Sequence, residues 1–232
     1  MSSDLPRWHA VVVAAGAGRR FGGETRKVGL ELAGAPVVLH SVRTLSGAAS
    51  FGGGVVVVHA DDVDLARRKW LPEGQGWAVA VGGVTRAESV QAGLLALSPD
   101  AAWVAVHDAA RPLVLQSDVE AVVRRAVEVG AAILATPVVE TLKRVRAGLV
   151  AETIDRSEVW RAETPQVFRL EWLRRAYSAW PRGDTDDAAL LERLGLPVAV
   201  VPTAGPNPKV TVAADLRLAE RLLADRAGAS EV

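Results

Sequence analysis

The residues of this chain best suited to chemistry lie in a loop that directly follows an apolar run. Residues 11–30 read VVVAAGAGRRFGGETRKVGL and hold five glycines and four basic side chains. Glycine turns expose backbone N–H groups that can hold phosphate oxygens, and arginine adds bidentate contacts. The alternative interpretation is a solvated basic loop. Because Gly16 and Gly18 come directly after the apolar run, we favour phosphate binding.

Two well-known phosphate-binding patterns do not fit the spacing of this loop. The dinucleotide fingerprint requires Gly or Ala at its third conserved position, where this chain has Phe21. The Walker pattern requires Gly-Lys and then Ser or Thr, but Gly23 is followed by Glu24. The sequence therefore predicts a phosphate cradle of another class.

Other polar residues are candidates for the same site. Asp108 follows the apolar run WVAVH, where it could pair locally with Arg111 or contact a ligand, and we favour the ligand. The four histidines are scattered and show no metal-ligand spacing. Residues 184–187, Asp-Thr-Asp-Asp, are interpreted as the capped start of a helix that ends near Gly195.

Short apolar runs must position these residues. They occupy residues 10–15, 54–60, 76–81, 103–110, 131–138 and 196–202. Their near-continuous apolarity is typical of strands buried on both faces of a parallel sheet. Helix-like stretches alternate with them, so the sequence predicts a three-layer, Rossmann-like α/β fold with a mostly parallel sheet. In such sheets ligands bind at the carboxyl ends of the strands, where the candidate residues lie.

The expected helices cover residues 35–48, 86–97, 117–130 and 215–226. The third has Ser117 followed by Glu120, the spacing of a capping box, and closes at Gly130. All of these elements belong to one expected domain, residues 1–232, with an insert at about residues 138–161.

That insert breaks the strand–helix alternation. It reads VVETLKRVRAGLVAETIDRSEVWR, with β-type alternation and a polar turn at Ala147-Gly148. We expect an extended hairpin arm. Isolated hairpins are marginally stable in water. Apolar residues such as Val145 and Leu149 therefore predict a packing partner, most simply a second subunit.

Composition limits the class of protein. Of the 232 residues, 50% are hydrophobic and 23% charged, and the formal net charge is +0. Neutral charge gives no general affinity for nucleic acid or membrane surfaces. The chain has no cysteine and no apolar run near the roughly 20 residues that cross a bilayer. Its first residues lack a signal-peptide pattern. We expect a soluble, cytoplasmic protein.

Several motifs in order resemble one enzyme family. The loop AAGAGRRFGGETRKVGLELAGAPVVLHSV resembles the signature of sugar-phosphate nucleotidyltransferases. The segments GGVTRAESVQAGL, VHDAARP, TIDRSEVWRAETPQVF, DTDDAALLERLG and NPKVT follow as in the 2-C-methyl-D-erythritol 4-phosphate cytidylyltransferases. The resemblance implies transfer of CMP from CTP to methylerythritol phosphate, with Mg²⁺, and release of pyrophosphate. The substrate phosphate is then the nucleophile, so His107 is interpreted as structural rather than as a base.

The resemblance divides the candidate residues by role. Those implied to contact CTP follow the apolar runs or lie in the glycine loop: Ala14, Ala15, Gly16, Gly18, Gly82, Gly83, Arg86, Ser89 and Asp108. Those implied to bind methylerythritol phosphate are polar or charged: Asp108, Arg111, Thr141, Arg156 and Lys209. The implied catalytic cations are Arg20, Lys27, Arg156 and Lys209. Asp108 is also the candidate Mg²⁺ ligand, with the ion held mainly by CTP phosphates.

The resemblance also implies a homodimer. Thr141 and Arg156 lie on the expected arm, which in the family is swapped between subunits, so they would complete the neighbouring active site. Some positions depart from the usual pattern. Arg26 and Val28 flank Lys27 where proline and glutamine are common, and Val84 replaces a frequent aspartate near the cytosine pocket.

Three rival functions remain open. A ribitol-5-phosphate cytidylyltransferase would share the loop, the base pocket and the mechanism. A non-catalytic nucleotide-binding regulator would be expected to lose Arg20, Lys27 or Lys209, all of which are present. A dinucleotide-dependent oxidoreductase is disfavoured by Phe21.

Overall fold

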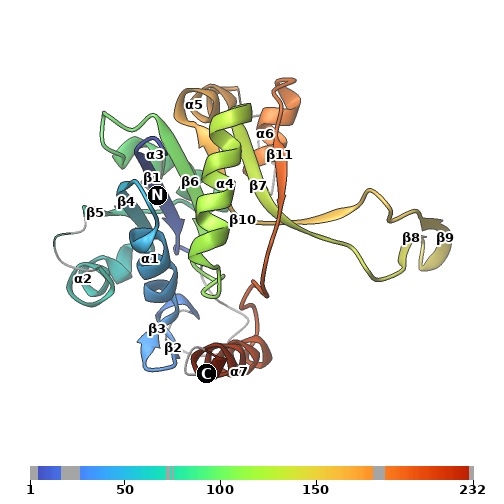
Figure 1. Cartoon of the computed structure of the whole chain (residues 1–232), viewed down its shortest axis with the longest axis horizontal. Coiled ribbons are helices and arrows are strands. Elements are labelled where there is room, and N and C mark those ends of the chain that lie inside the picture. The colour runs from blue at the N-terminus through green and yellow to red at the C-terminus, as the bar shows by residue number, and fades with distance from the viewer. Residues whose placement is uncertain (1–4, 17–26, 72–73, 75, 180–185, 230–232) are drawn as a thin grey trace.

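The structure is a computed structural model that describes residues 5–16, 27–71, 74, 76–179 and 186–229 (Figure 1). Its centre is a seven-stranded sheet in the order β11-β7-β10-β6-β1-β4-β5. Every neighbouring pair is parallel except those of β10, which runs antiparallel to both β6 and β7. The predicted mostly parallel sheet is confirmed. The strands are β1 (Trp8–Val13), β4 (Phe51–Val58), β5 (Trp77–Val81), β6 (Trp103–Asp108), β7 (Ala131–Pro137), β10 (Trp160–Arg169) and β11 (Ala199–Pro202).

Helices cover both faces of the sheet and make three layers. On one face, α1 (Val37–Gly47) and α4 (Gln116–Val129) pack with the short η4 (Ala66–Trp70). On the other, α3 (Arg86–Ala96), α5 (Leu170–Ser178) and α6 (Asp187–Arg193) share a second core. In β1, Val12 belongs to the first core and Val11 to the second, as expected for a strand buried on both faces.

The strand order places a switch point beside β1. The chain passes from β1 to β4 and β5 on one side, and then to β6 on the other. Ligands of open α/β sheets bind outside the carboxyl ends of the strands at such a point. Residues directly after β1, β5 and β6 therefore meet at one edge.

The C-terminal helix lies below the sheet in this view (Figure 1). Helix α7 (Ala213–Ala229) packs Ala219 against Leu32, Leu113 and Val210. Leu32 belongs to a small hairpin of β2 (Glu31–Leu32) and β3 (Ala35–Pro36). Three further short helical segments are η2 (Lys27–Gly29), η3 (Ala60–Asp62) and α2 (Val63–Leu65). In the part of the chain that the structure describes, none of the helices has the length and apolarity needed to cross a membrane.

The expected arm is present and projects away from the sheet (Figure 1). It consists of β8 (Leu142–Arg146) and β9 (Leu149–Ile154), which pair antiparallel. Ala147 and Gly148 form the turn with positive φ angles of 48° and 78°. Leu149 is 74% exposed. The hairpin is confirmed, whereas its packing against a second subunit stays a prediction.

The caps of two helices differ from expectation. Helix α4 begins at Gln116 after Leu115, and no side chain caps it. The predicted capping box is therefore wrong, because the Glu120 carboxylate instead accepts from the Ala49 N–H and the Gln116 amide. A capping box does occur on α3, between Thr85 and Glu88. The predicted end of α4 is confirmed, since Gly130 is left-handed with φ 108°.

Candidate active site

A cleft of about 750 Å³ opens at the carboxyl edge of the sheet, beside the switch point. It is bounded by residues that follow β1, β4, β5 and β6 and by the first turn of α3. The lining residues are Val13, Ala15, Gly16, Val28, His59, Ala60, Val81, Gly82, Gly83, Val84, Thr85, Arg86, Ser89, Asp108, Ala110, Lys209 and Thr211.

The cleft collects most of the residues predicted from the sequence. Eight of them line it: Ala15, Gly16, Gly82, Gly83, Arg86, Ser89, Asp108 and Lys209. Ala14 lies beneath the surface, where its N–H donates to the Val57 carbonyl. Gly18, Arg20 and the side chain of Lys27 lie outside the described residues. Thr141 and Arg156 are exposed on or beside the arm and do not line the cleft.

Two consecutive glycines form one wall through close backbone approach. A side chain at Gly82 would place its Cβ 2.4 Å from Ala15 Cβ and 2.7 Å from Ser89 Oγ. At Gly83 the Cβ would lie 2.3 Å from Glu88 Cβ. All three distances are far shorter than a van der Waals contact, so only glycine fits at these two positions. Ser89, which lines the same cleft, donates to the Thr85 carbonyl at 2.9 Å within the first turn of α3.

Asp108 is the electrostatic centre of the cleft. Its Oδ1 accepts from Arg86 Nε at 2.9 Å and its Oδ2 from Lys209 Nζ at 2.5 Å. Burial alone would raise the pKa of Asp108, but the two cations outweigh it and hold the pKa well below the usual range. The carboxylate therefore stays charged and holds two cations at the cleft wall.

Arg86 is held from behind by two residues that sequence reasoning missed. Its Nη1 donates to Asp187 Oδ2 at 2.7 Å, and Tyr177 Oη donates to Asp187 Oδ1 at 2.5 Å. Burial opposes the charge of Arg86, yet Asp187 and Asp108 outweigh it and raise the pKa. The helix expected after the acidic run is confirmed, with Asp186 at its N-cap position and Asp187 in its first turn. Side-chain capping is wrong for these two residues, because α6 has no side-chain cap and Asp186 accepts from Gln166.

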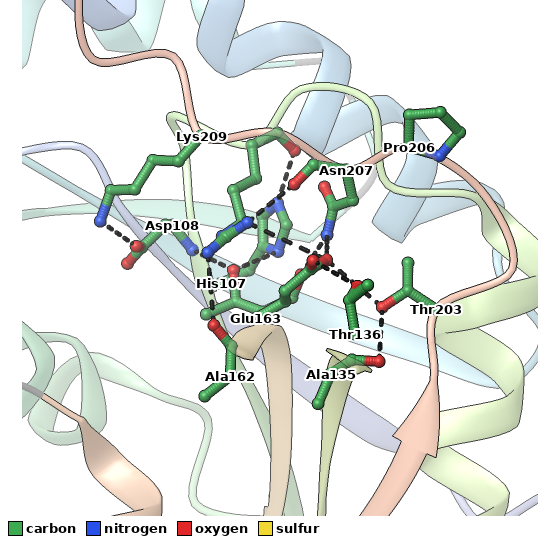
Figure 2. Close-up of polar contacts among 12 residues, drawn as sticks. His107, Asp108, Ala135, Thr136, Ala162, Glu163, Thr203, Pro206, Asn207 and Lys209 are labelled. Atoms are coloured by element: carbon green, nitrogen blue, oxygen red, sulfur yellow. Dashed lines mark hydrogen bonds and ion pairs between the residues drawn. The ribbon is translucent and has the colours of Figure 1, made fainter. Parts of the chain in front are cut away.

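Arg111 lies behind Lys209 rather than in the cleft. Its Nη1 donates to the Asn207 carbonyl at 2.7 Å, and its Nη2 donates to the Ala162 carbonyl at 3.5 Å. It lines a neighbouring cavity of about 720 Å³ that shares Lys209 with the cleft. Figure 2 shows Lys209 paired with Asp108 on one side of this region and Glu163 with Asn207 on the other.

His107 is structural, as predicted. It is fully buried below Asp108, and its Nε2 lies 3.2 Å from both the Ser41 hydroxyl and the Arg111 carbonyl. Because a carbonyl only accepts, Nε2 carries the proton, and Nδ1 accepts from the Thr164 hydroxyl at 3.1 Å. The Thr164 oxygen in turn accepts from the Asp108 N–H at 3.1 Å. The imidazole thus fixes the backbone of Asp108.

We expect this buried imidazole to make the protein less stable as the pH falls. Burial lowers the pKa of His107 from 6.5 to about 4. Between these values the unfolded chain binds a proton that the folded protein does not, so acid favours unfolding. The free energy of unfolding should fall by roughly 3 kcal/mol over this window from this residue alone. Urea titrations at several pH values measure it, and His107→Gln should flatten the slope; an unchanged slope would contradict the assignment.

The departures from the family pattern have different structural consequences. Val84 lines the cleft but is 99% exposed, so the departure from aspartate leaves an apolar side chain in solvent at the edge of the cleft. Val28 is buried in the first core, where glutamine would place an amide among apolar side chains. Arg26 lies outside the described residues.

Comparison with known proteins decides the family. The sequence model described as "IspD: 2-C-methyl-D-erythritol 4-phosphate cytidylyltransferase" matches residues 8–225. The chain belongs to this family. A 2-C-methyl-D-erythritol 4-phosphate cytidylyltransferase of Pelotomaculum thermopropionicum is 43% identical, covering 94% of this chain and 95% of the relative. One of the same name from Azoarcus sp. is 40% identical over the full length of both chains.

Solved structures of family members share the fold. The 4-diphosphocytidyl-2C-methyl-D-erythritol synthase of Anaerococcus prevotii superposes with a TM-score of 0.84 at 26% identity, covering 94% of this chain and 96% of that one. The cytidylyltransferase of Thermus thermophilus gives 0.77 at 29% identity, covering 93% and 98%. The family and the α/β fold expected from the sequence motifs are both confirmed.

Proposed function

We propose that this protein transfers CMP from CTP to 2-C-methyl-D-erythritol 4-phosphate and releases pyrophosphate. The observation that carries the proposal is the pairing of Asp108 with both Arg86 and Lys209 in the cleft at the switch point. Membership in the cytidylyltransferase family supports the same activity. We keep a cytoplasmic location as a prediction.

The glycine wall suits the base of the nucleotide. Gly82 and Gly83 present backbone without side chains, and a pyrimidine edge can be read by fixed backbone donors and acceptors. Gly16 adds open backbone to the cleft, since nothing lies within 4 Å of the position of its missing Cβ. Arg86, at the start of α3, is placed to meet the triphosphate.

The reaction needs positioning and charge neutralisation more than acid–base groups. The phosphate of methylerythritol phosphate is already a nucleophile, and negative charge accumulates around the α-phosphorus of CTP. Lys209 lies at the cleft and is partly exposed, so its ammonium can contact substrate phosphate. We assign Arg20 and Lys27 the same task at the α-phosphate, on the basis of the family motif. Arg111 would support the substrate from behind Lys209.

A Mg²⁺ ion fits this site if phosphates supply most of its ligands. In the described part of the chain, no cluster of three or more His, Asp or Glu side chains could hold a metal. Mg²⁺ is commonly bound by one or two carboxylates together with substrate phosphates, and Asp108 is the carboxylate at the cleft. When bound, the ion would neutralise triphosphate charge. Asp108 would hold it while keeping Arg86 and Lys209 in place.

The arm gives a reason for a homodimer. Val145, Leu149 and Val150 are exposed on it, and Arg156 follows it well outside the cleft of its own chain. Burying such apolar residues favours association. We infer a homodimer in which Thr141 and Arg156 reach the neighbouring cleft.

Mixing two inactive variants tests this inference. Lys209→Ala removes a basic side chain from the cleft, and Arg156→Ala removes one that the arm would contribute to the neighbouring cleft. Each homodimer alone should therefore be nearly inactive. After subunits exchange, a mixed dimer has one intact site, and activity should recover to about a quarter of the wild-type value. Native mass spectrometry confirms that mixed dimers form. Mixed dimers without recovered activity would show that Arg156 does not act across the dimer.

Pyrophosphate release tests the activity and its substrate together. We expect release with CTP and Mg²⁺ to depend on methylerythritol phosphate and to stop when EDTA removes the metal. Release with ribitol 5-phosphate instead would keep the mechanism but change the substrate. Binding of CTP without release with either polyol phosphate would indicate a nucleotide-binding regulator.

A further inference from the structure

The segment that carries Lys209 is held by a buried carboxylate that has no role in the chemistry described above. Glu163 lies in β10, 6% exposed. Its Oε1 accepts from Thr136 Oγ1 at 2.8 Å, and its Oε2 accepts from Asn207 Nδ2 at 3.0 Å and from Thr203 Oγ1 at 3.3 Å. Figure 2 shows these side chains converging on Glu163.

Asn207 connects the hydrogen bonds of Glu163 to the segment that carries Lys209. Its Nδ2 donates to the Thr164 carbonyl at 3.0 Å as well as to Glu163, so both amide hydrogens are used. Its backbone carbonyl accepts from Arg111 Nη1 at 2.7 Å. Prolines at 206 and 208 flank it and restrict the backbone on both sides. Asn207 therefore cannot move without breaking contacts to β10 and to Arg111, which lies in the loop after β6.

Lys209 follows two residues later, so the position of its backbone depends on that of Asn207. On its far side, the Val210 N–H donates to the Ala110 carbonyl at 2.7 Å. Between these two anchors the backbone has little freedom, and the Lys209 ammonium meets Asp108. The same network touches Arg111, whose Nη1 lies 3.9 Å from Glu163 Oε2.

We propose that Glu163 is a positioning residue that, through Asn207 and Arg111, sets where the Lys209 ammonium lies in the cleft. The proposal rests on the proposed function for its kinetic consequence, but its structural content is independent of activity. Glu163 itself does not line the cleft that holds Lys209.

Hydrogen bonding rather than charge is the essential property of Glu163. A glutamine can direct its oxygen to Asn207 and Thr203 and its amide to the Thr136 hydroxyl, which can also accept. Glu163→Gln should therefore keep the segment in place. Glu163→Leu has a similar size but leaves the Asn207 amide and the Thr203 hydroxyl without this acceptor.

The kinetic test compares these two variants with a matched control. Because a small displacement of a catalytic group is costly, Glu163→Leu should lower kcat/KM for methylerythritol phosphate by about tenfold or more. The KM for CTP should stay near the wild-type value, and Glu163→Gln should be close to wild type. Asp118→Leu removes another buried carboxylate that holds the same segment, through the Ala204 N–H at 3.0 Å, but farther from Lys209. It should lower the melting temperature without this kinetic change.

Hydrogen exchange gives a readout that does not need activity. Exchange of the Val210 amide should speed up in Glu163→Leu and not in Glu163→Gln. Asn207→Ala, which leaves Glu163 in place, should reproduce the Glu163→Leu result if the leucine variant folds poorly. Unchanged kinetics and exchange in folded Glu163→Leu would overturn the proposal, as would equal kinetic losses in Asp118→Leu or in Glu163→Gln. An inactive wild-type protein would instead refute the proposed function, and the exchange data would still test Glu163.

Discussion

Lys209→Ala is expected to lower kcat/KM for methylerythritol phosphate by about 10²- to 10³-fold, the loss seen when one preorganised charge-stabilising group is removed. Lys209 is held against Asp108 at 2.5 Å, and its side chain is 41% exposed at the cleft. It can therefore reach a ligand without reorganisation. Steady-state kinetics with each substrate varied in turn measures the effect.

The fold should survive this substitution. Asp108 keeps its bond to Arg86, and the Val210 anchor remains. Lys69→Ala is the matched control, because Lys69 is an exposed lysine that does not line the cleft. Its kinetics should equal those of the wild type. A Lys209→Ala enzyme within about threefold of the wild type would show that the ammonium has no catalytic task, since a 10²-fold loss is the expected minimum.

Asp187→Ala is expected to have the largest effect on stability, lowering the free energy of unfolding by about 3 to 5 kcal/mol. Asp187 is 1% exposed and accepts from both Arg86 and Tyr177. Without it, a largely buried guanidinium loses one carboxylate partner and keeps Asp108, and the bond from the Tyr177 hydroxyl to Asp187 is lost. Urea unfolding measures the change.

The same substitution should weaken CTP binding, because Arg86 lines the cleft and loses the group that fixes it from behind. We expect the Kd for CTP to rise about tenfold, the equivalent of roughly 1.4 kcal/mol. Glu192→Ala, at an exposed position on the same helix, is the control and should leave both quantities unchanged. Loss of stability without any change in Kd would mean that Arg86 holds the fold but not the nucleotide.

Most of the fold could be predicted because its strands carry their own signal. The valine runs of β1 and β4 are apolar on both faces, which marks a central parallel strand whatever surrounds it. Gly130 is a local requirement too, since its left-handed backbone tolerates few other residues. The predicted cap of α4 was wrong because it depends on a contact between residues that are distant in sequence. Glu120 had a local partner in sequence, but the folded chain brings it to Ala49, which is 71 residues away.

The site was predictable only where a motif marks it. Asp108 was found because it comes at the end of an apolar run, and Gly82 and Gly83 were found through the resemblance to the family motifs; all three line the cleft. Asp187 was missed because acidic residues before a helix usually cap it. Its partner Arg86 is 101 residues away, so no local sequence pattern predicts that they pair. Glu163 and Asn207 are similar cases. Their roles depend on contacts between distant segments that periodicity and spacing do not record.

The central claim is that the phosphate of the second substrate attacks the α-phosphorus of CTP, and isotope labelling tests it most directly. Methylerythritol phosphate carrying ¹⁸O in its non-ester phosphate oxygens is incubated with the enzyme, CTP and Mg²⁺, and the products are analysed by mass spectrometry. We predict that all of the label stays in a cytidine diphosphate ester of methylerythritol and that the pyrophosphate is unlabelled. Free CMP as the nucleotide product, or label in the pyrophosphate, would contradict the account.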